Sequence, residues 1–122
     1  MIESRKDFGL DYRHLHPVKP CRHRDGAFDS LGQMQKIKDE YKEALEAWAT
    51  WLNETTGKNR EKLLEELIDM MTAIRTYLAG AGYTQDEVER EICLVNIKNR
   101  NRGYWDETGG SGDEIESGGI ER

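Results

Sequence analysis

Residues 39–48 read DEYKEALEAW and form the centre of an amphipathic helix. Apolar residues around this stretch recur at steps of three and four, the period of an α-helix. They are Met34, Ile37, Tyr41, Leu45, Trp48 and Leu52. This spacing predicts a helix over about 31–53, with Ser30 as its N-cap. Glu40 and Glu43 stand among these apolar positions, which is unusual for residues that only need solvent.

The same arrangement returns in LLEELIDMM, residues 63–71, where Glu66 and Asp69 interrupt an apolar run. Helical periodicity continues over about 60–80 and predicts a second helix there. The polar segment NETTGKN (53–59) separates the two helices and is expected to form a hairpin loop.

A third helix is expected over about 85–102. Thr84 and Glu87 have the spacing of a capping box at its start, and the glycines of the preceding AGAGYT are typical of a helix C-terminus. Acidic residues in its first half and basic residues at its end complement the helix dipole. The expected fold class is therefore all-α: an antiparallel helical bundle of two long helices plus a third, completed by dimerisation.

The chain of 122 residues has room for one small domain, and such a domain buries limited surface by itself. Residues 1–29 show no steady period and contain both prolines, so they are expected to form an irregular arm. Residues 30–105 are expected to form the helical domain. Residues 106–122 are rich in Gly, Ser and acidic residues and are expected to be disordered.

The net charge of −6 comes mainly from residues 106–122, which carry one Arg against six Asp/Glu. The remaining chain is close to neutral, so bulk charge gives no reason to expect binding to a nucleic-acid polymer. No apolar run is long enough for a membrane span, and no signal-peptide core is present. With two distant cysteines and no disulfide framework, we expect a cytoplasmic protein with reduced thiols.

The two acidic pairs are expected to meet. Residues three apart project from one side of a helix, one turn apart. The distances of Glu43 and Glu66 from the hairpin loop differ by about one helical turn, about 6 Å, which an asymmetric loop can absorb. Four carboxylates would then converge, and they need protons, water or a hard cation. Oxygen ligands alone favour Mg²⁺ or Mn²⁺ over zinc, and Mg²⁺ favours phosphate oxygens as further ligands. A solvated acidic helix face is the alternative.

The third helix offers basic residues at a matching height. Asp69 and Lys98 lie at similar distances from the turn that joins their helices. Antiparallel packing would therefore bring Lys98, Arg100 and Arg102 level with the carboxylates. Cations beside a metal site are what a polyphosphate requires.

The compound pattern Glu40-x-x-Glu43, spacer, Glu66-x-x-Asp69 resembles the motif of the MazG-like all-α nucleoside triphosphate pyrophosphohydrolases. That motif reads EExxE, a spacer, then ExxD, and here Asp39 replaces the first Glu. The ending NIKNRNRGYW (96–105) is also similar to the basic third long helix of that family. The likeness covers about residues 31–105. The superfamily also includes dimeric dUTPases and phosphoribosyl-ATP pyrophosphohydrolases.

The resemblance implies Mg²⁺-dependent hydrolysis of an NTP or dNTP to the monophosphate and pyrophosphate, with Mn²⁺ as a possible substitute. It implies metal ligation by Glu40, Glu43, Glu66 and Asp69, with Glu40 or Glu43 acting on the attacking water. It also implies a homodimer or a dimer of dimers. The implied substrate-binding residues are Lys98, Asn99, Arg102 (or Arg100), Asn96 and Trp51. Trp51 would contact the base if it is exposed, and Trp48 is then the weaker candidate.

Two other interpretations stay open at the level of sequence. A non-catalytic helical interaction module would use the Trp48/Trp51 surface to bind a partner helix, and a phosphoribosyl-ATP pyrophosphohydrolase would share the chemistry with another substrate. The arm residues His14, His16, Cys21 and His23 have donor atoms that suit zinc, but their spacing matches no common zinc site.

Overall fold

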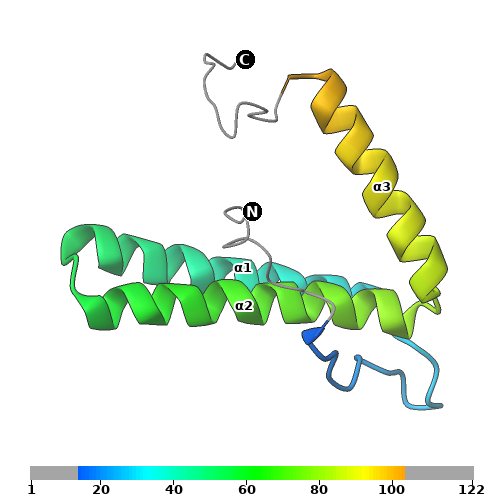
Figure 1. Ribbon diagram of the computed structural model, residues 1–122. Coiled ribbons are helices and arrows are strands. Elements are labelled where there is room, and N and C mark those ends of the chain that lie inside the picture. The colour runs from blue at the N-terminus through cyan, green and yellow to red at the C-terminus, as the bar shows by residue number, and fades with distance from the viewer. Residues whose placement is uncertain (1–13, 104–122) are drawn as a thin grey trace. The chain divides into compact units, whose positions relative to one another are not determined.

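The computed structural model describes residues 14–103. The expected disordered segment 106–122 and the first part of the arm lie outside the described residues. Within 14–103 the chain forms three α-helices, α1 (Ser30–Asn53), α2 (Gly57–Gly80) and α3 (Gln85–Asn101), as Figure 1 shows. The predicted all-α fold class is confirmed.

The helix caps explain where each helix begins. Asp29, one residue before the predicted Ser30, is the N-cap of α1, and its Oδ1 accepts a hydrogen bond of 2.9 Å from the Gly32 N–H. The α2 helix begins earlier than predicted because Thr56 caps it by accepting from the Asn59 N–H. At α3 the predicted capping box of Thr84 is present with both of its hydrogen bonds.

Helices α1 and α2 form an antiparallel hairpin and pack along their length (Figure 1). Small side chains fill the interface, since the buried apolar residues are Ala44, Ala47 and Ala73. Alanine allows two helix backbones to approach closely. The other buried residues are polar or charged: Gln33, Glu40, Glu66 and Thr76. The centre of the hairpin is therefore narrow and polar, unlike an ordinary leucine-rich helical core.

The described part of the arm packs on this hairpin through backbone hydrogen bonds. The Val18 N–H donates to Thr76 Oγ1 and the Cys21 N–H to Gln33 Oε1, both at 3.0 Å. The Gln33 amide then donates to the Ala73 carbonyl at 3.1 Å. Gln33, which is only 2% exposed, thus links the arm, α1 and α2.

An aromatic contact holds the end of the arm. The Phe28 ring meets Tyr77 of α2 edge to face, with ring centroids 5.3 Å apart. A Cβ added at Gly80 would lie within 3 Å of the Phe28 ring, so glycine is needed where the arm crosses the end of α2.

The large apolar residues of the hairpin are exposed. Those that the helical period places in stripes include Met34, Tyr41, Leu45, Trp48, Leu52, Leu64, Leu67 and Ile74. Trp48 retains 48% of its accessible surface and Leu52 retains 53%. The predicted apolar stripes are present on both helices. Within one chain, however, the face that carries Ala44, Ala47 and Ala73 makes the helix–helix contact, so much of the larger apolar surface stays uncovered.

Helix α3 belongs to a second compact unit and is considered by itself. Several of its apolar residues are exposed, among them Ile92, Leu94, Val95 and Ile97. None of the helices in the described part of the chain is both long enough and apolar enough to cross a membrane.

Candidate metal centre

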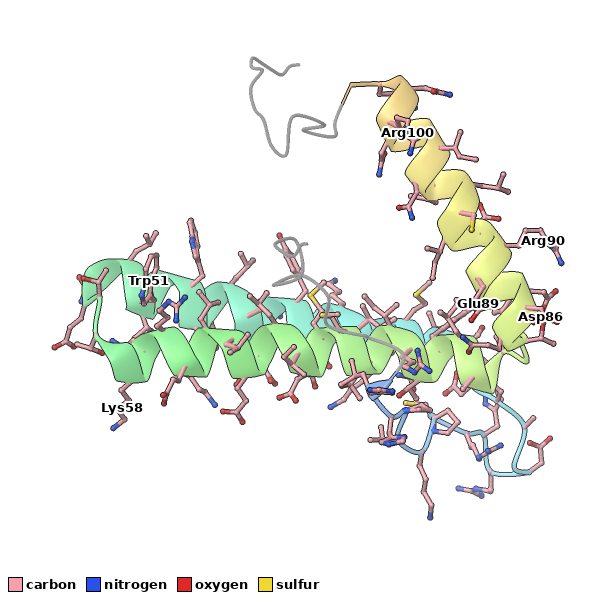
Figure 2. The ribbon with its side chains drawn as sticks, viewed as in Figure 1. Trp51, Lys58, Asp86, Glu89, Arg90 and Arg100 are labelled. Atoms are coloured by element: carbon pink, nitrogen blue, oxygen red, sulfur yellow. The ribbon has the colours of Figure 1, made fainter. Side chains whose placement is uncertain are left out.

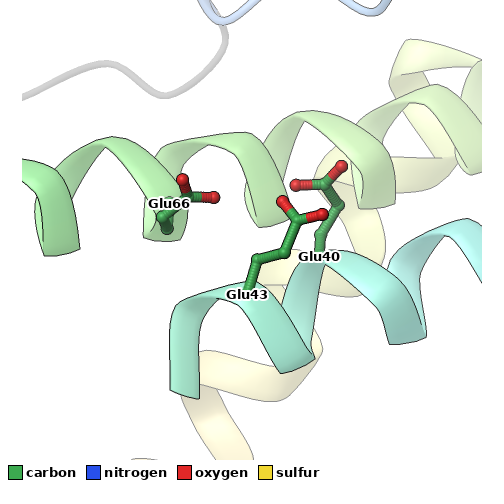
Figure 3. Close-up of side chains that lie close together, drawn as sticks. All are labelled: Glu40, Glu43 and Glu66. Atoms are coloured by element: carbon green, nitrogen blue, oxygen red, sulfur yellow. The ribbon is translucent and has the colours of Figure 1, made fainter. Parts of the chain in front are cut away.

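Three glutamates converge between α1 and α2. Glu40 and Glu43 come from α1, one turn apart, and Glu66 comes from α2 (Figure 3). Each offers a carboxylate oxygen, and these three oxygens lie within 4.8 Å of one another. Within residues 14–103 this is the one group of three or more His, Cys, Asp or Glu side chains that is close enough to hold a metal ion.

The two glutamates that face each other across the hairpin are buried, and a lysine neutralises each of them. Glu40 and Glu66 are both 7% exposed. Lys36 Nζ lies 2.9 Å from Glu40 Oε2, and Lys62 Nζ lies 2.8 Å from Glu66 Oε2. Both pairs join residues four apart on one helix, so each lysine is fixed close to its carboxylate.

The second oxygen of each buried carboxylate has no hydrogen-bond partner among residues 14–103. Glu40 Oε1 and Glu66 Oε1 are both buried and unsatisfied. A buried acceptor without a donor destabilises a folded protein, and a charged one does so more. A divalent cation would satisfy both atoms, and oxygen-only ligands suit Mg²⁺ or Mn²⁺. The residues present therefore fit a hard metal ion.

The electrostatics of the centre also favour a cation. Glu43 is exposed, yet its pKa is raised, first by repulsion from Glu40, then by loss of hydration and by Glu66. The pKa of Asp69 is raised as well, first by loss of hydration and then by repulsion from Glu40 and Glu66. Hydrogen bonds to the glutamates raise the pKa values of Lys36 and Lys62. Negative charge thus remains in excess despite the two lysines.

Two grooves flank the carboxylates. The arm-side groove has a volume of about 320 Å³ and the loop-side groove one of about 260 Å³. The arm-side groove is lined by Val18, Lys19 and Cys21 of the arm, by Gln33, Lys36 and Glu40 of α1, and by Asp69, Thr72 and Ala73 of α2. The loop-side groove is lined by Glu43, Glu46, Ala47 and Thr50 of α1 and by Asn59, Lys62 and Glu66 of α2.

Asp69, the fourth ligand implied by the motif, lies beside the group of three. Its side chain lines the arm-side groove together with Glu40. It is not among the three residues whose oxygens fall within 4.8 Å. A direct role for Asp69 as a metal ligand stays a prediction.

The expected substrate-binding residues come from α1 and from the segment of α3. Lys98, Asn99 and Asn96 stand on α3, and Arg102 is its C-cap residue. Their contact with the carboxylates stays a prediction, because α3 belongs to the second unit. Trp51 is half-buried on α1 near the hairpin loop (Figure 2), and its contact with a base likewise stays a prediction.

The arm residues that suggested zinc do not form such a group in the described part of the chain. Cys21 lines the arm-side groove, while His23 Nε2 lies 3.8 Å from Asp29 Oδ1. The guanidinium of Arg22 donates to the Gly26 carbonyl within the same turn.

Sequence reasoning did not single out Lys36 and Lys62, although a signal for them exists. A shift of 26 residues superimposes Lys36, Glu40 and Glu43 on Lys62, Glu66 and Asp69. The same shift superimposes Ala47 on Ala73 and Thr50 on Thr76. In an antiparallel hairpin, a repeat of this kind relates the two helices by an approximate local two-fold axis. A search for internal repeats would have identified both lysines.

Comparisons with family models, curated proteins and solved structures found no match to this chain. The likeness to MazG-like enzymes therefore rests on the acidic motif and on the basic segment 96–105.

Proposed function

We propose that the protein is a Mg²⁺-dependent nucleoside triphosphate pyrophosphohydrolase of MazG-like type. It would cleave an NTP or dNTP between the α and β phosphates and release the monophosphate and pyrophosphate. One observation carries the proposal: two buried glutamates, each with an unsatisfied oxygen, meet a third glutamate within 4.8 Å. A solvated acidic helix face, the alternative at the level of sequence, would not bury its carboxylates between two helices.

The residues divide into roles by burial. Glu40 and Glu66 are held by packing and by their lysines, which suits them to hold the cation in a fixed place. The bound cation would neutralise phosphate oxygens and make a bound water more acidic. Glu43 is exposed, and its raised pKa suits it to accept a proton from an attacking water. Asp69 would extend the ligand set from the arm side.

Substrate binding would draw on α3. Lys98 and Arg102 would bind the outgoing pyrophosphate, Asn99 or Asn96 would donate to a phosphate or sugar, and Trp51 would contact the base. The assignments on α3 come from the likeness of residues 96–105 to the third helix of the family, and the basic last turn of α3, which includes Lys98 and Arg100, supports them.

A homodimer or a dimer of dimers would complete the bundle. The support is the apolar surface left uncovered on the hairpin, where Trp48, Leu52 and Leu64 each keep about half of their accessible area or more. Exposed apolar surface of this kind marks an interaction site.

The same exposed apolar surface favours the second candidate, a non-catalytic helical interaction module. That candidate does not explain why Glu40 and Glu66 are buried. Phosphoribosyl-ATP hydrolysis differs only in substrate.

A substrate panel tests the reaction. Purified protein with Mg²⁺ is incubated with each common and modified NTP and dNTP, and the products are separated by chromatography. We expect monophosphate and pyrophosphate from at least one nucleotide, and loss of turnover on chelation or in Glu43→Gln. Glu65→Gln is the matched control, because the Glu65 side chain is 64% exposed and lies next to the centre in sequence.

Two results would contradict the proposal. If folded protein hydrolyses no nucleotide, the resemblance to MazG-like enzymes concerns the fold and not the activity. Full activity in Glu43→Gln would show that the carboxylate of Glu43 does not take part in the reaction.

A further inference from the structure

The two grooves are copies of each other under the local two-fold axis. The shift of 26 residues relates Gln33, Lys36 and Glu40 of the arm-side groove to Asn59, Lys62 and Glu66 of the loop-side groove. It relates Ala47 and Glu43 of the loop-side groove to Ala73 and Asp69 of the arm-side groove. A fully symmetric centre would accept an extended substrate in either of two opposite directions. A difference between the two grooves is therefore needed to give the substrate a single orientation.

Two features break the symmetry, and both act on charge. Thr72 of the arm-side groove corresponds to Glu46 of the loop-side groove. The arm adds Lys19 to the first groove, whereas the lining of the second comes from α1 and α2. Among the lining residues that the structure describes, two lysines thus balance two carboxylates in the arm-side groove, while a single lysine faces three carboxylates in the loop-side groove. An anion is favoured in the first and disfavoured in the second.

The backbone of Lys19 is held in place at the arm-side groove. The hydrogen bonds from the Val18 N–H to Thr76 and from the Cys21 N–H to Gln33 fix the backbone on both sides of it. Both acceptors are buried, Thr76 completely. The counterpart of Thr76 under the local two-fold is Thr50, which is exposed and lines the open loop-side groove. The arm therefore occupies one of two equivalent positions on the hairpin.

We propose that the arm-side groove binds the polyphosphate of the substrate, with Lys19 and Lys36 as phosphate ligands. Ammonium groups bind phosphate as compact point charges, and those of Lys19 and Lys36 come from different segments of one groove. The acidic loop-side groove repels the phosphates, so the substrate binds in one direction only. This assignment rests on the proposed function, which it deepens by adding Lys19 and Lys36 to the phosphate ligands Lys98 and Arg102 proposed above and by naming the groove that sets the direction of the substrate.

Calorimetric titration with inorganic tripolyphosphate, with and without Mn²⁺, tests the subsite directly. Lys19→Met is expected to weaken tripolyphosphate binding about tenfold, as loss of a charge-assisted hydrogen bond does. Mn²⁺ affinity without tripolyphosphate should stay unchanged. Lys38→Met is the matched control, since Lys38 is an exposed lysine of α1 that lines neither groove. Equal weakening in both variants, or none in Lys19→Met, would overturn the assignment.

A second variant separates charge from structure. Thr72→Glu gives the arm-side groove the residue of its symmetric partner. The Thr72 hydroxyl donates to the Ile68 carbonyl of its own helix, and neither of the hydrogen bonds from the described arm to the helices involves it. Tripolyphosphate binding should fall at least as far as in Lys19→Met, while Mn²⁺ binding is kept. Unchanged tripolyphosphate affinity in Thr72→Glu would overturn the charge argument.

Nucleotide kinetics distinguish this proposal from the proposed function. In an active enzyme, Lys19→Met should raise KM for the nucleotide about tenfold with kcat largely kept. Hydrolysis with an unchanged KM in both variants would overturn the groove assignment alone. A wild-type chain that binds tripolyphosphate, loses this binding in both variants and hydrolyses no nucleotide would overturn the proposed function and support the groove.

Discussion

Replacing the buried Glu66 by Gln is expected to have opposite effects on the free and the metal-bound protein. In the metal-free protein Glu66 Oε1 is a buried acceptor without a donor, which costs about 1–3 kcal/mol of stability. A Gln amide nitrogen there would donate to a neighbouring carboxylate, and the amide oxygen would still accept from Lys62. The lost ion pair contributes little, because the Lys62 side chain is 57% exposed. Metal-free Glu66→Gln should therefore unfold at the same temperature as the wild type or a higher one.

With metal the order reverses. At a Mn²⁺ concentration of about one hundred times Kd, binding stabilises the wild type by about 2.7 kcal/mol. For a unit of this size that raises Tm by about 10–20 °C. Loss of one ligand that weakens binding about hundredfold leaves only about 0.4 kcal/mol at the same concentration, or about 2–3 °C.

The assay is a thermal unfolding scan, followed by circular dichroism, with and without Mn²⁺. Glu65→Gln serves as the control, since it makes the same chemical change one residue away and its carboxylate lies 3.9 Å from the same lysine. The control should keep the full metal response. The reasoning is refuted if Mn²⁺ leaves the wild type unchanged, or if Glu66→Gln keeps the metal response of the control.

Three further predictions concern the arm, the pH dependence and the apolar surface. Gln33→Leu should destabilise the protein by about 1–3 kcal/mol in denaturant unfolding, because it leaves the Cys21 N–H without its acceptor and removes a second hydrogen bond from the Ala73 carbonyl; an unchanged midpoint would contradict this. Metal-free stability should fall as pH rises from the ordinary pKa values of Asp69 and Glu43, 3.8 and 4.5, to their raised folded values. The sign follows because the folded state binds more protons than the unfolded state in that window, and a stability that rises there would refute it. Trp48→Glu should dissociate the proposed dimer in sedimentation measurements, and an unchanged mass would show that this surface is not the interface.

The positions of the helices could be predicted because apolar periodicity and cap chemistry are local. The errors at the first two helix starts both concern the N-cap, because the residue that caps a helix is decided by which side chain accepts from the N–H groups of the first turn. Asp29 and Ser30 are both good caps, and the hydrogen bond to the Gly32 N–H decides between them. The α2 helix begins at Gly57 although glycine and polar residues suggest a break, because the Thr56 hydroxyl satisfies the Asn59 N–H.

The convergence of Glu40, Glu43 and Glu66 could be predicted because it needs only residue spacing and a hairpin. What covers the apolar stripes could not be predicted, since periodicity shows which residues share a face but not which face meets the neighbouring helix. Alanine at positions 44, 47 and 73 decides that question, and a hydrophobicity pattern gives alanine little weight. Lys36 and Lys62 were not predicted because the acidic motif specifies only the Glu and Asp positions and not the lysines that pair with them.

The alanine interface and the carboxylate centre have one physical origin. Two glutamate side chains fit between α1 and α2 only if their neighbours in the interface are small, as Ala44, Ala47 and Ala73 are. Small neighbours bury little apolar area, so the hairpin gains little stability from its own core. The larger apolar side chains are then left for another surface to cover, which a second copy does in the proposed dimer. On this argument the carboxylate site and the need for a partner arise together, and filling the interface with leucine would weaken both.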